Sequence, residues 1–239
     1  RKLAGEFSGR GHHCTYIPLE EILHGKTTPI WDDYELFGFG YPIHAMDAPR
    51  IVYELLPLLP SGRHNCFLYK NAGSGFALGG STRRLRLALA QRGWIVKHES
   101  FFTMPANMLI PPSPEKIRMF LDKALEAIPV TVSQILNEDR VLLPDTGLMR
   151  FASLLNRSEC HGLPKISKCW IASSACIRCG KCVKQCPTGN ISLTEDGLEF
   201  SDKCVLCLRC WWNCPTRALE NTKFKYFQLK EPYSLPDEE

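Results

Sequence analysis

Eight of the twelve cysteines in this 239-residue chain stand in two copies of one pattern. Each copy has three cysteines spaced two residues apart, a fourth after three further residues, and then a proline. The copies are Cys176, Cys179, Cys182 and Cys186 before Pro187, and Cys204, Cys207, Cys210 and Cys214 before Pro215. Every cysteine of the second copy lies 28 positions after its counterpart. Thiolates in this spacing ligate iron–sulfur clusters, so the expected chemistry is the transfer of single electrons.

The spacing also predicts which cysteines share a cluster. Three thiolates two residues apart can fold around one corner of an iron–sulfur cube, with backbone N–H groups of the loop pointing at sulfur. The fourth cysteine lies too far along its own loop and is better placed to ligate the other cluster. We therefore expect two 4Fe-4S clusters, one held by Cys176, Cys179, Cys182 and Cys214 and the other by Cys204, Cys207, Cys210 and Cys186.

Two other uses of clustered cysteines fit this pattern less well. Four-cysteine zinc sites also need tetrahedral sulfur, but they pair two CxxC knuckles across a long gap. A disulfide framework would strain cysteines this close in sequence, and the chain is long enough to form its own core. Thiolate ligands must stay reduced until a cluster is built, so the cysteine content favours a reducing cytoplasm.

The segment from about Lys165 to Asn221 resembles a two-cluster bacterial ferredoxin. This resemblance implies a small α+β module that carries one electron on each cluster at low potential. Three tryptophans in or beside the repeat are expected to shield the clusters from water, namely Trp170, Trp211 and Trp212. Four cysteines without the repeat spacing are expected to be ordinary thiols, namely Cys14, Cys66, Cys160 and Cys169.

Composition and charge exclude several classes of protein. The chain is 44% hydrophobic and has no run of 18 uncharged apolar residues and no signal-peptide core, so we expect no membrane segment. Its net charge of +4 is too small and dispersed to indicate nucleic acid. Within residues 165–221, eight basic residues outnumber five acidic ones. This excess favours redox partner proteins with acidic surfaces, although solvated side chains without a partner explain it equally well.

The residues before this segment alternate between strand and helix patterns. Strands are expected at His13–Ile17, Tyr34–Gly40, Cys66–Ala72 and Trp94–Phe102. Helices are expected at Arg1–Ser8, Ala48–Leu59, Ser81–Arg92 and from Pro114 to about Asn137. The alternation predicts an α/β domain in which helices cover both faces of a doubly wound parallel sheet.

Two strand-to-helix turns of this domain offer groups that suit a planar ligand. Ligands of such sheets bind at the carboxyl ends of the strands. The turn that starts at Tyr41 supplies a ring and a polar edge, and the glycine-rich turn that starts at Gly73 brings backbone N–H groups close. Ordinary turns use the same residues, so the residues alone leave both interpretations open.

Together, GFGYPIHAMDAP and YKNAGSG resemble the flavodoxin family, in which two such turns embrace the flavin of FMN. A flavodoxin-like domain followed by a two-cluster ferredoxin resembles the EFR-type ferredoxin family, and this resemblance spans nearly the whole chain. It implies that one side of the flavin is lined by Tyr41, Pro42, His44 and Ala45. It implies that the other side is contacted by Asn71, Ala72, Gly73 and Ser74.

The chain departs from the flavodoxin pattern at its N-terminus. A flavodoxin begins with a strand and a loop that wraps the FMN phosphate at a helix N-terminus, where N–H groups and the helix dipole favour an anion. This chain starts inside the helix that should follow that loop, so the phosphate loop is absent from it. We expect a truncated sequence whose first strand is missing, in preference to a domain that has lost FMN.

These observations divide the chain into four expected segments. They are a flavodoxin-like α/β domain at 1–139, a connecting segment at 140–164, a ferredoxin domain at 165–221 and a C-terminal tail at 222–239. The leading hypothesis is an electron-transfer protein, in which an FMN would interconvert one- and two-electron chemistry.

Two other hypotheses remain open. One is a flavin and iron–sulfur oxidoreductase that reduces a small substrate near Tyr41, His44 and Phe76. The other is a ferredoxin whose α/β domain is a docking scaffold without a cofactor. The sequence contains no GxSxG, HExxH or Walker motif, so we assign no catalytic side chain.

Overall fold

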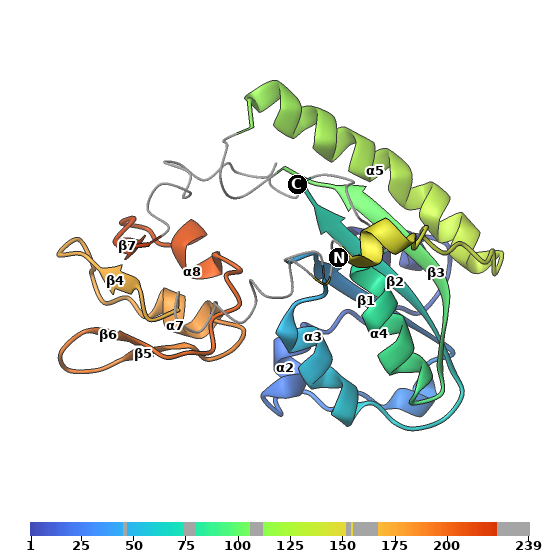
Figure 1. Cartoon of the computed structure of the whole chain (residues 1–239), viewed down its shortest axis with the longest axis horizontal. Coiled ribbons are helices and arrows are strands. Elements are labelled where there is room, and N and C mark those ends of the chain that lie inside the picture. The colour runs from blue at the N-terminus through green and yellow to red at the C-terminus, as the bar shows by residue number, and fades with distance from the viewer. Residues whose placement is uncertain (45–46, 74–79, 106–111, 152–153, 155–166, 224–239) are drawn as a thin grey trace. The chain divides into compact units, whose positions relative to one another are not determined.

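A computed structural model describes residues 1–44, 47–73, 80–105, 112–151, 154 and 167–223 (Figure 1). These residues fall into two compact units, one within residues 1–158 and the other within 159–239. The first unit is a mixed α/β structure. The second is a small ferredoxin-like structure that contains the cysteine repeat.

A three-stranded parallel sheet forms the centre of the first unit (Figure 1). Its strands are β1 (Leu36–Pro42), β2 (His64–Ala72) and β3 (Trp94–Thr103), in the order β1-β2-β3. The three corresponding strand predictions are confirmed. The prediction of a strand at His13–Ile17 is wrong, because these residues form no strand. Their apolar pattern favours an extended backbone, but a strand also needs a neighbour to pair with, and the described sheet joins only β1, β2 and β3.

Helices join these strands in chain order. α3 (Arg50–Leu55) continues as the 3-10 helix η2 (Leu56–Leu58), α4 (Gly80–Ala90) joins β2 to β3, and α5 (Pro114–Leu136) follows β3. Before the sheet lie α1 (Lys2–Gly9), α2 (Leu19–Leu23) and the 3-10 helix η1 (Trp31–Asp33). The four predicted helices are confirmed, with ends that differ by a few residues. Ser113 caps α5, because its Oγ accepts the backbone N–H of Lys116.

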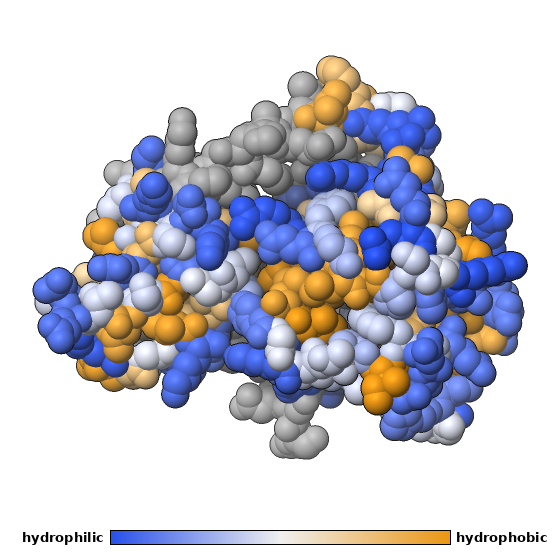
Figure 2. Space-filling model, turned by 90° about the horizontal axis from the view of Figure 1, so that it is seen from below, coloured by the Kyte–Doolittle hydropathy of each residue, from blue (hydrophilic) through white to orange (hydrophobic). Residues whose placement is uncertain are grey.

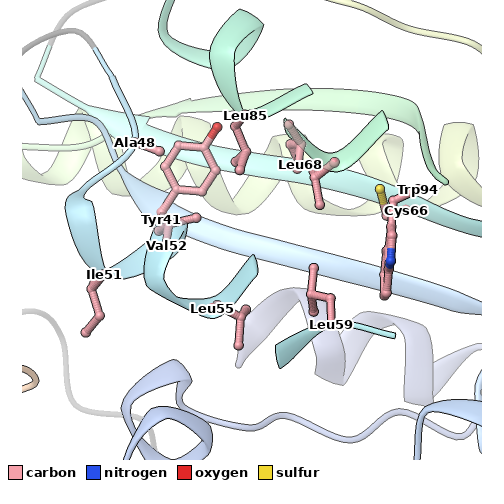
Figure 3. Close-up of a cluster of buried hydrophobic side chains, with 11 residues drawn as sticks. Tyr41, Ala48, Ile51, Val52, Leu55, Leu59, Cys66, Leu68, Leu85 and Trp94 are labelled. Carbon is pink, nitrogen blue, oxygen red and sulfur yellow. The ribbon is translucent and has the colours of Figure 1, made fainter. Parts of the chain in front are cut away.

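Alternate side chains of β2 enter two separate hydrophobic clusters. Cys66 and Leu68 pack with residues of α3 and α4, as Figure 3 shows. Phe67 and Tyr69 pack on the opposite face with residues of α1 and α5. The Phe67 ring lies over Gly38 of β1, where an added Cβ would come within 2.4 Å of the ring. Helices therefore cover both faces of the parallel sheet, as the sequence predicts.

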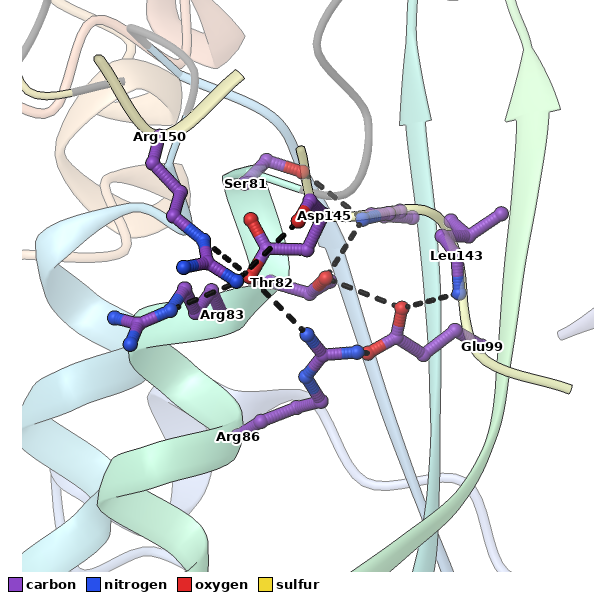
Figure 4. Close-up of polar contacts among 9 residues, drawn as sticks. Ser81, Thr82, Arg83, Arg86, Glu99, Leu143, Asp145 and Arg150 are labelled. Atoms are coloured by element: carbon purple, nitrogen blue, oxygen red, sulfur yellow. Dashed lines mark hydrogen bonds and ion pairs between the residues drawn. The ribbon is translucent and has the colours of Figure 1, made fainter. Parts of the chain in front are cut away.

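A buried polar network attaches the segment after α5 to this sheet (Figure 4). Glu99 of β3 accepts the backbone N–H of Leu143 at 3.0 Å and pairs with Arg86 of α4 at 3.1 Å. Lys70 of β2 donates to the hydroxyl groups of Ser81 and Thr82 at the start of α4. Burial lowers the pKa of Lys70 to about 7, although Glu99 acts in the opposite direction. Residue 143, within the expected connecting segment 140–164, thus contacts the α/β unit directly.

The second unit repeats its elements along with its cysteines. It contains β4 (Trp170–Ala172), α7 (Lys181–Gln185), β5 (Ile191–Leu193), β6 (Leu198–Phe200), α8 (Arg209–Trp212) and β7 (Leu219–Asn221). β6 and β7 begin 28 positions after β4 and β5. β4 pairs antiparallel with β7, and β5 pairs antiparallel with β6. Each two-stranded sheet therefore takes one strand from each copy, which interlocks the two halves of the repeat.

Candidate metal centre

The eight repeated cysteines line two cavities in the second unit, with four cysteines in each. Cavity A contains Cys186 from the first copy and Cys204, Cys207 and Cys210 from the second. Cavity B contains Cys176, Cys179 and Cys182 from the first copy and Cys214 from the second. Cavities A and B hold about 370 and 350 Å³ of space free of protein atoms, open solvent included, so they are close to equal in size.

The interlocked strands explain why each cavity mixes the two copies. Cys186 stands at the end of α7, and Pro187 leads the chain into β5, which pairs with β6 of the second copy. Cys214 follows α8 in the same way and leads into β7, which pairs with β4 of the first copy. The fourth cysteine of each copy therefore lies next to the first three cysteines of the other copy. A proline at this position fixes φ and has no N–H to satisfy.

Backbone N–H groups point at several of these sulfur atoms. The N–H of Asn190 donates to Cys186 Sγ at 3.2 Å, and the N–H of Ala218, 28 positions later, donates to Cys214 Sγ at 3.3 Å. The N–H of Leu206 donates to Cys204 Sγ at 3.3 Å. Such bonds stabilise negative charge on sulfur, which thiolate ligands and sulfide carry.

Left-handed backbone positions also repeat at 28 residues. Arg178 and Leu206 have φ of 55° and 50°, and Gly180 and Leu208 have φ of 69° and 59°. Gly189 is left-handed at 59°, and its counterpart Arg217 at 53°. These conformations turn successive N–H groups toward the inside of a loop, which suits an anionic group. They strain the second copy more, because non-glycine residues there adopt a region that favours glycine.

The two cavities differ in how well they are closed. Leu208, which lines cavity A, is 3% exposed, whereas Ile177, which lines cavity B, is 63% exposed. Cys179 of cavity B is the exposed cysteine of the eight, and Arg178 and Lys181 also line that cavity. The lining of cavity B therefore contains more exposed residues and more basic side chains than the lining of cavity A.

Burial raises the pKa of thiols in both cavities, including that of Cys182 in cavity B. Burial raises the pKa of Cys207 to about 11, and burial also raises the pKa of Cys210. Burial acts to raise the pKa of Cys214 as well, but N–H groups of Ala218 and its neighbours outweigh it and lower that pKa. None of the eleven described cysteines forms a disulfide with another described residue. Cys14, Cys66 and Cys169, which were expected to be ordinary thiols, line neither cavity, and Cys160 lies outside the described residues.

One residue of the site, Asn190, gave no signal when the cysteines alone were considered. Asn190 is buried and accepts hydrogen bonds through Oδ1 from Ser201 Oγ at 2.9 Å and from the N–H of Lys203 at 2.7 Å. These bonds fix residues 201–203, which lead into Cys204. Trp170 was expected to shield a cluster, and it lines cavity A with 4% of its surface exposed. Alignment of all residues at the 28-residue offset identifies both, because their counterparts Ala218 and Leu198 line cavity B.

The described residues that were expected at a flavin lie at one edge of the α/β sheet, with one exception. Pro42 and Asn71 are register partners at the ends of β1 and β2, and the N–H of Ile43 donates to the Asn71 carbonyl oxygen at 2.8 Å. His44 forms a backbone bridge with Asp47. The exception is Tyr41, which is 5% exposed and packs in the core against the α3 and α4 side of the sheet (Figure 3).

The other residues of that set are placed as follows. Ala72 ends β2 and is half-buried, and its carbonyl oxygen accepts the N–H of Met104 at 3.0 Å. Gly73 follows it and is exposed. Ala45 and Ser74 lie outside the described residues. The two turns thus begin side by side, as expected from a parallel sheet.

Apolar side chains are exposed among charged ones on the face that Figure 2 shows. No helix in the described part of the chain is long and apolar enough to cross a membrane.

Comparison with known proteins identifies the cysteine-rich segment. Residues 175–218 match a family model described as a 4Fe-4S dicluster domain. No curated protein matches the chain. The match covers both copies of the repeat and all eight cysteines that line the two cavities. Residues 175–218 are therefore a 4Fe-4S ferredoxin domain, whose chemistry is iron–sulfur electron transfer.

Proposed function

We propose that this chain binds two 4Fe-4S clusters, one in each cavity, and transfers single electrons through them. In this assignment Cys204, Cys207, Cys210 and Cys186 hold the cluster of cavity A. The cluster of cavity B is held by Cys176, Cys179, Cys182 and Cys214. The observation that carries the proposal is that two separate cavities of similar size are each lined by four cysteines.

The donor set suits such clusters on chemical grounds. Four thiolates can complete the coordination of the four iron atoms of a cube, and the N–H groups directed at sulfur stabilise its negative charge. A zinc ion would need all four sulfur atoms within about 2.3 Å of one point. Among the described residues, no group of three or more His, Cys, Asp or Glu side chains has the arrangement of a single-ion site.

The clusters supply the redox chemistry, and the chain's own residues position and insulate them. The cysteines would hold each cluster in place, and the apolar residues around cavity A would exclude water from it. The open side of cavity B, with Ile177, Arg178 and Lys181, suits close approach by a redox partner protein with an acidic surface. We propose that electrons enter and leave the protein at cavity B.

A second candidate function adds FMN at the α/β unit. It is favoured by the adjacent ends of β1 and β2, where Pro42 pairs with Asn71 and Gly73 is exposed. This second candidate also rests on the resemblance to EFR-type ferredoxins. In such a protein a flavodoxin-like domain would exchange electrons with the clusters. The buried ring of Tyr41 does not fit the expected flavin contact, so that contact would have to come from the other residues of the turn. A cofactor-free docking domain remains the alternative.

Cofactor analysis of the whole chain separates these functions. Protein purified without oxygen is expected to contain about eight iron and about eight acid-labile sulfide per chain. One FMN per chain, released on denaturation, would support the second candidate. Iron and sulfide without flavin would leave the iron–sulfur electron carrier alone, and protein with zinc in place of iron would contradict the proposal.

A further inference from the structure

One of the polar differences between the two halves of the repeat lies at the start of their first strands. Trp170 lines cavity A, and its counterpart at the 28-residue offset, Leu198, lines cavity B. Trp170 begins β4 and Leu198 begins β6, so the two side chains occupy equivalent places in the fold. Only the indole carries a hydrogen-bond donor.

The indole N–H of Trp170 is buried beside cavity A. Nε1 has almost no contact with solvent, and among the described residues no oxygen, nitrogen or sulfur atom accepts a regular hydrogen bond from it. A buried donor without an acceptor costs on the order of 1–3 kcal/mol, so native proteins rarely retain one. Such a group in a cofactor cavity indicates that its acceptor belongs to the cofactor.

The four cysteines of cavity A belong to the same lining as this donor. Cys204 also packs in the same hydrophobic cluster as Trp170. The acceptors that a 4Fe-4S cluster presents in this position are thiolate and sulfide sulfur, both of which carry negative charge.

On the basis of the two-cluster function proposed above, we propose that the indole N–H of Trp170 donates a hydrogen bond to sulfur of the cluster in cavity A and raises that cluster's reduction potential. Reduction adds one electron to the cluster and makes its sulfur atoms more negative. A donor aimed at sulfur therefore stabilises the reduced form more than the oxidised form. Leu198 gives the cluster in cavity B no such donor, so the repeat holds two inequivalent clusters. Trp170 is thus a positioning and tuning residue rather than a ligand.

Trp170→Phe tests this role because phenylalanine keeps most of the ring and removes the N–H. We expect a potentiometric titration with dithionite, followed by EPR, to show a more negative potential for one cluster and an unchanged potential for the other. The expected change in the ratio of reduced to oxidised cluster at fixed potential is about tenfold, which corresponds to about 59 mV for one electron. Ile171→Val, at the next and exposed position of β4, lines neither cavity and is the control that should change neither potential.

A second measurement needs no variant. Protein labelled with ¹⁵N at the indole nitrogens, reduced and studied by pulsed EPR, should show a nitrogen hyperfine coupling to one cluster. Trp170→Phe should remove that coupling, and Trp212→Phe should not. A cluster without indole coupling in the labelled protein, or equal potentials in Trp170→Phe and the parent chain, would overturn the inference.

The iron and sulfide content distinguishes this failure from failure of the proposed function. If the chain binds about eight iron and eight sulfide but shows no indole coupling, two clusters are present and Trp170 does not tune either. If only the four cysteines of cavity B hold a cluster, both the two-cluster function and the role of Trp170 are refuted.

Discussion

The two halves of the ferredoxin unit share a ligand pattern and differ in what surrounds it. Both cavities receive three cysteines from one copy and one from the other, with a proline after each crossing cysteine. Cavity A is closed by buried apolar residues such as Trp170 and Leu208. Cavity B has an exposed cysteine, Cys179, and two basic neighbours, Arg178 and Lys181.

This difference teaches that the repeat sets ligand geometry while the residues between the ligands set the electrostatic environment. Cluster potentials respond to hydrogen bonds on sulfur, to nearby charge and to solvent exposure. All three of these features vary between the two cavities, although the cysteine spacing does not. One sequence pattern, used twice, can therefore give two sites with different potentials and different access to a partner.

The largest effect is expected from removing one crossing ligand. Cys214→Ala should abolish the cluster of cavity B and leave that of cavity A, because Cys214 lines cavity B with the first copy's run of three. Cys186→Ala should do the reverse. Iron analysis should show a loss of about half the iron in each variant, and EPR should show that different signals survive. Cys14→Ala, outside both cavities, is the control, and loss of the same signal in both ligand variants would refute the crossed assignment.

Removal of iron should also distinguish the two cavities. Incubation of the oxidised protein with a chelator such as EDTA should extract iron from cavity B several times faster, because Cys179 and Ile177 there are exposed. The progress of iron release should then be biphasic, with about half the iron in each phase. A single phase would show that the difference in exposure has no effect on cluster lability. Cys214→Ala should lack the fast phase.

Asn190→Ala should destabilise the unit, because it removes the acceptor of the Ser201 hydroxyl and the Lys203 N–H. The acceptor is buried, so we expect a loss of about 1–3 kcal/mol. Each kcal/mol should lower the midpoint of thermal unfolding by roughly 4–8 °C. The midpoint can be measured from the loss of cluster absorbance in the absence of oxygen. Ser192→Ala, at an exposed position of β5, is the control. An unchanged midpoint for Asn190→Ala would show that these bonds do not hold the loop before Cys204.

Substitutions at two equivalent left-handed positions should change the stability of the unit in opposite directions. Arg217→Gly should stabilise the second copy by about 1 kcal/mol, because Arg217 has φ of 53°. Gly189→Ala should destabilise the first copy by a similar amount, because Gly189 has φ of 59°. An added Cβ at Gly189 meets no atom within 4 Å, so the expected loss comes from backbone strain and not from a steric clash. Midpoints that shift in the same direction would contradict this comparison.

The smallest effect is expected from the charge beside cavity B. Lys181→Gln should lower the potential of that cluster, because a positive charge near an anionic cluster favours the reduced form. Lys181 is exposed and screened by solvent, so the effect should be below about 1 kcal/mol and should shrink as salt is added. Lys168→Gln, also exposed but outside the cavity B lining, should have less effect. Equal shifts for both variants would indicate a general charge effect.

The sequence predicts most of this architecture because each feature depends on local spacing. The cysteine repeat alone indicates the metal–sulfur chemistry, and helix and strand periodicity predicts the sheet of β1, β2 and β3. The strand predicted at His13–Ile17 failed because pairing depends on a neighbour that local pattern does not reveal.

The remaining features depend on contacts between distant residues. The Tyr41 ring lies in the core instead of at the sheet edge, since alternation in β1 places it on the side of α3 and α4. The attachment of Leu143 to Glu99 joins residues 44 positions apart, so no window of sequence predicts it. The difference between Trp170 and Leu198 is visible in the sequence only after the whole repeat is aligned at 28 residues.

Iron and acid-labile sulfide per chain, measured on protein purified without oxygen, test the central claim most directly. Two clusters in two cysteine-lined cavities predict about eight iron and about eight sulfide. About four of each would mean that only one of the two cavities holds a cluster, and this would contradict the account.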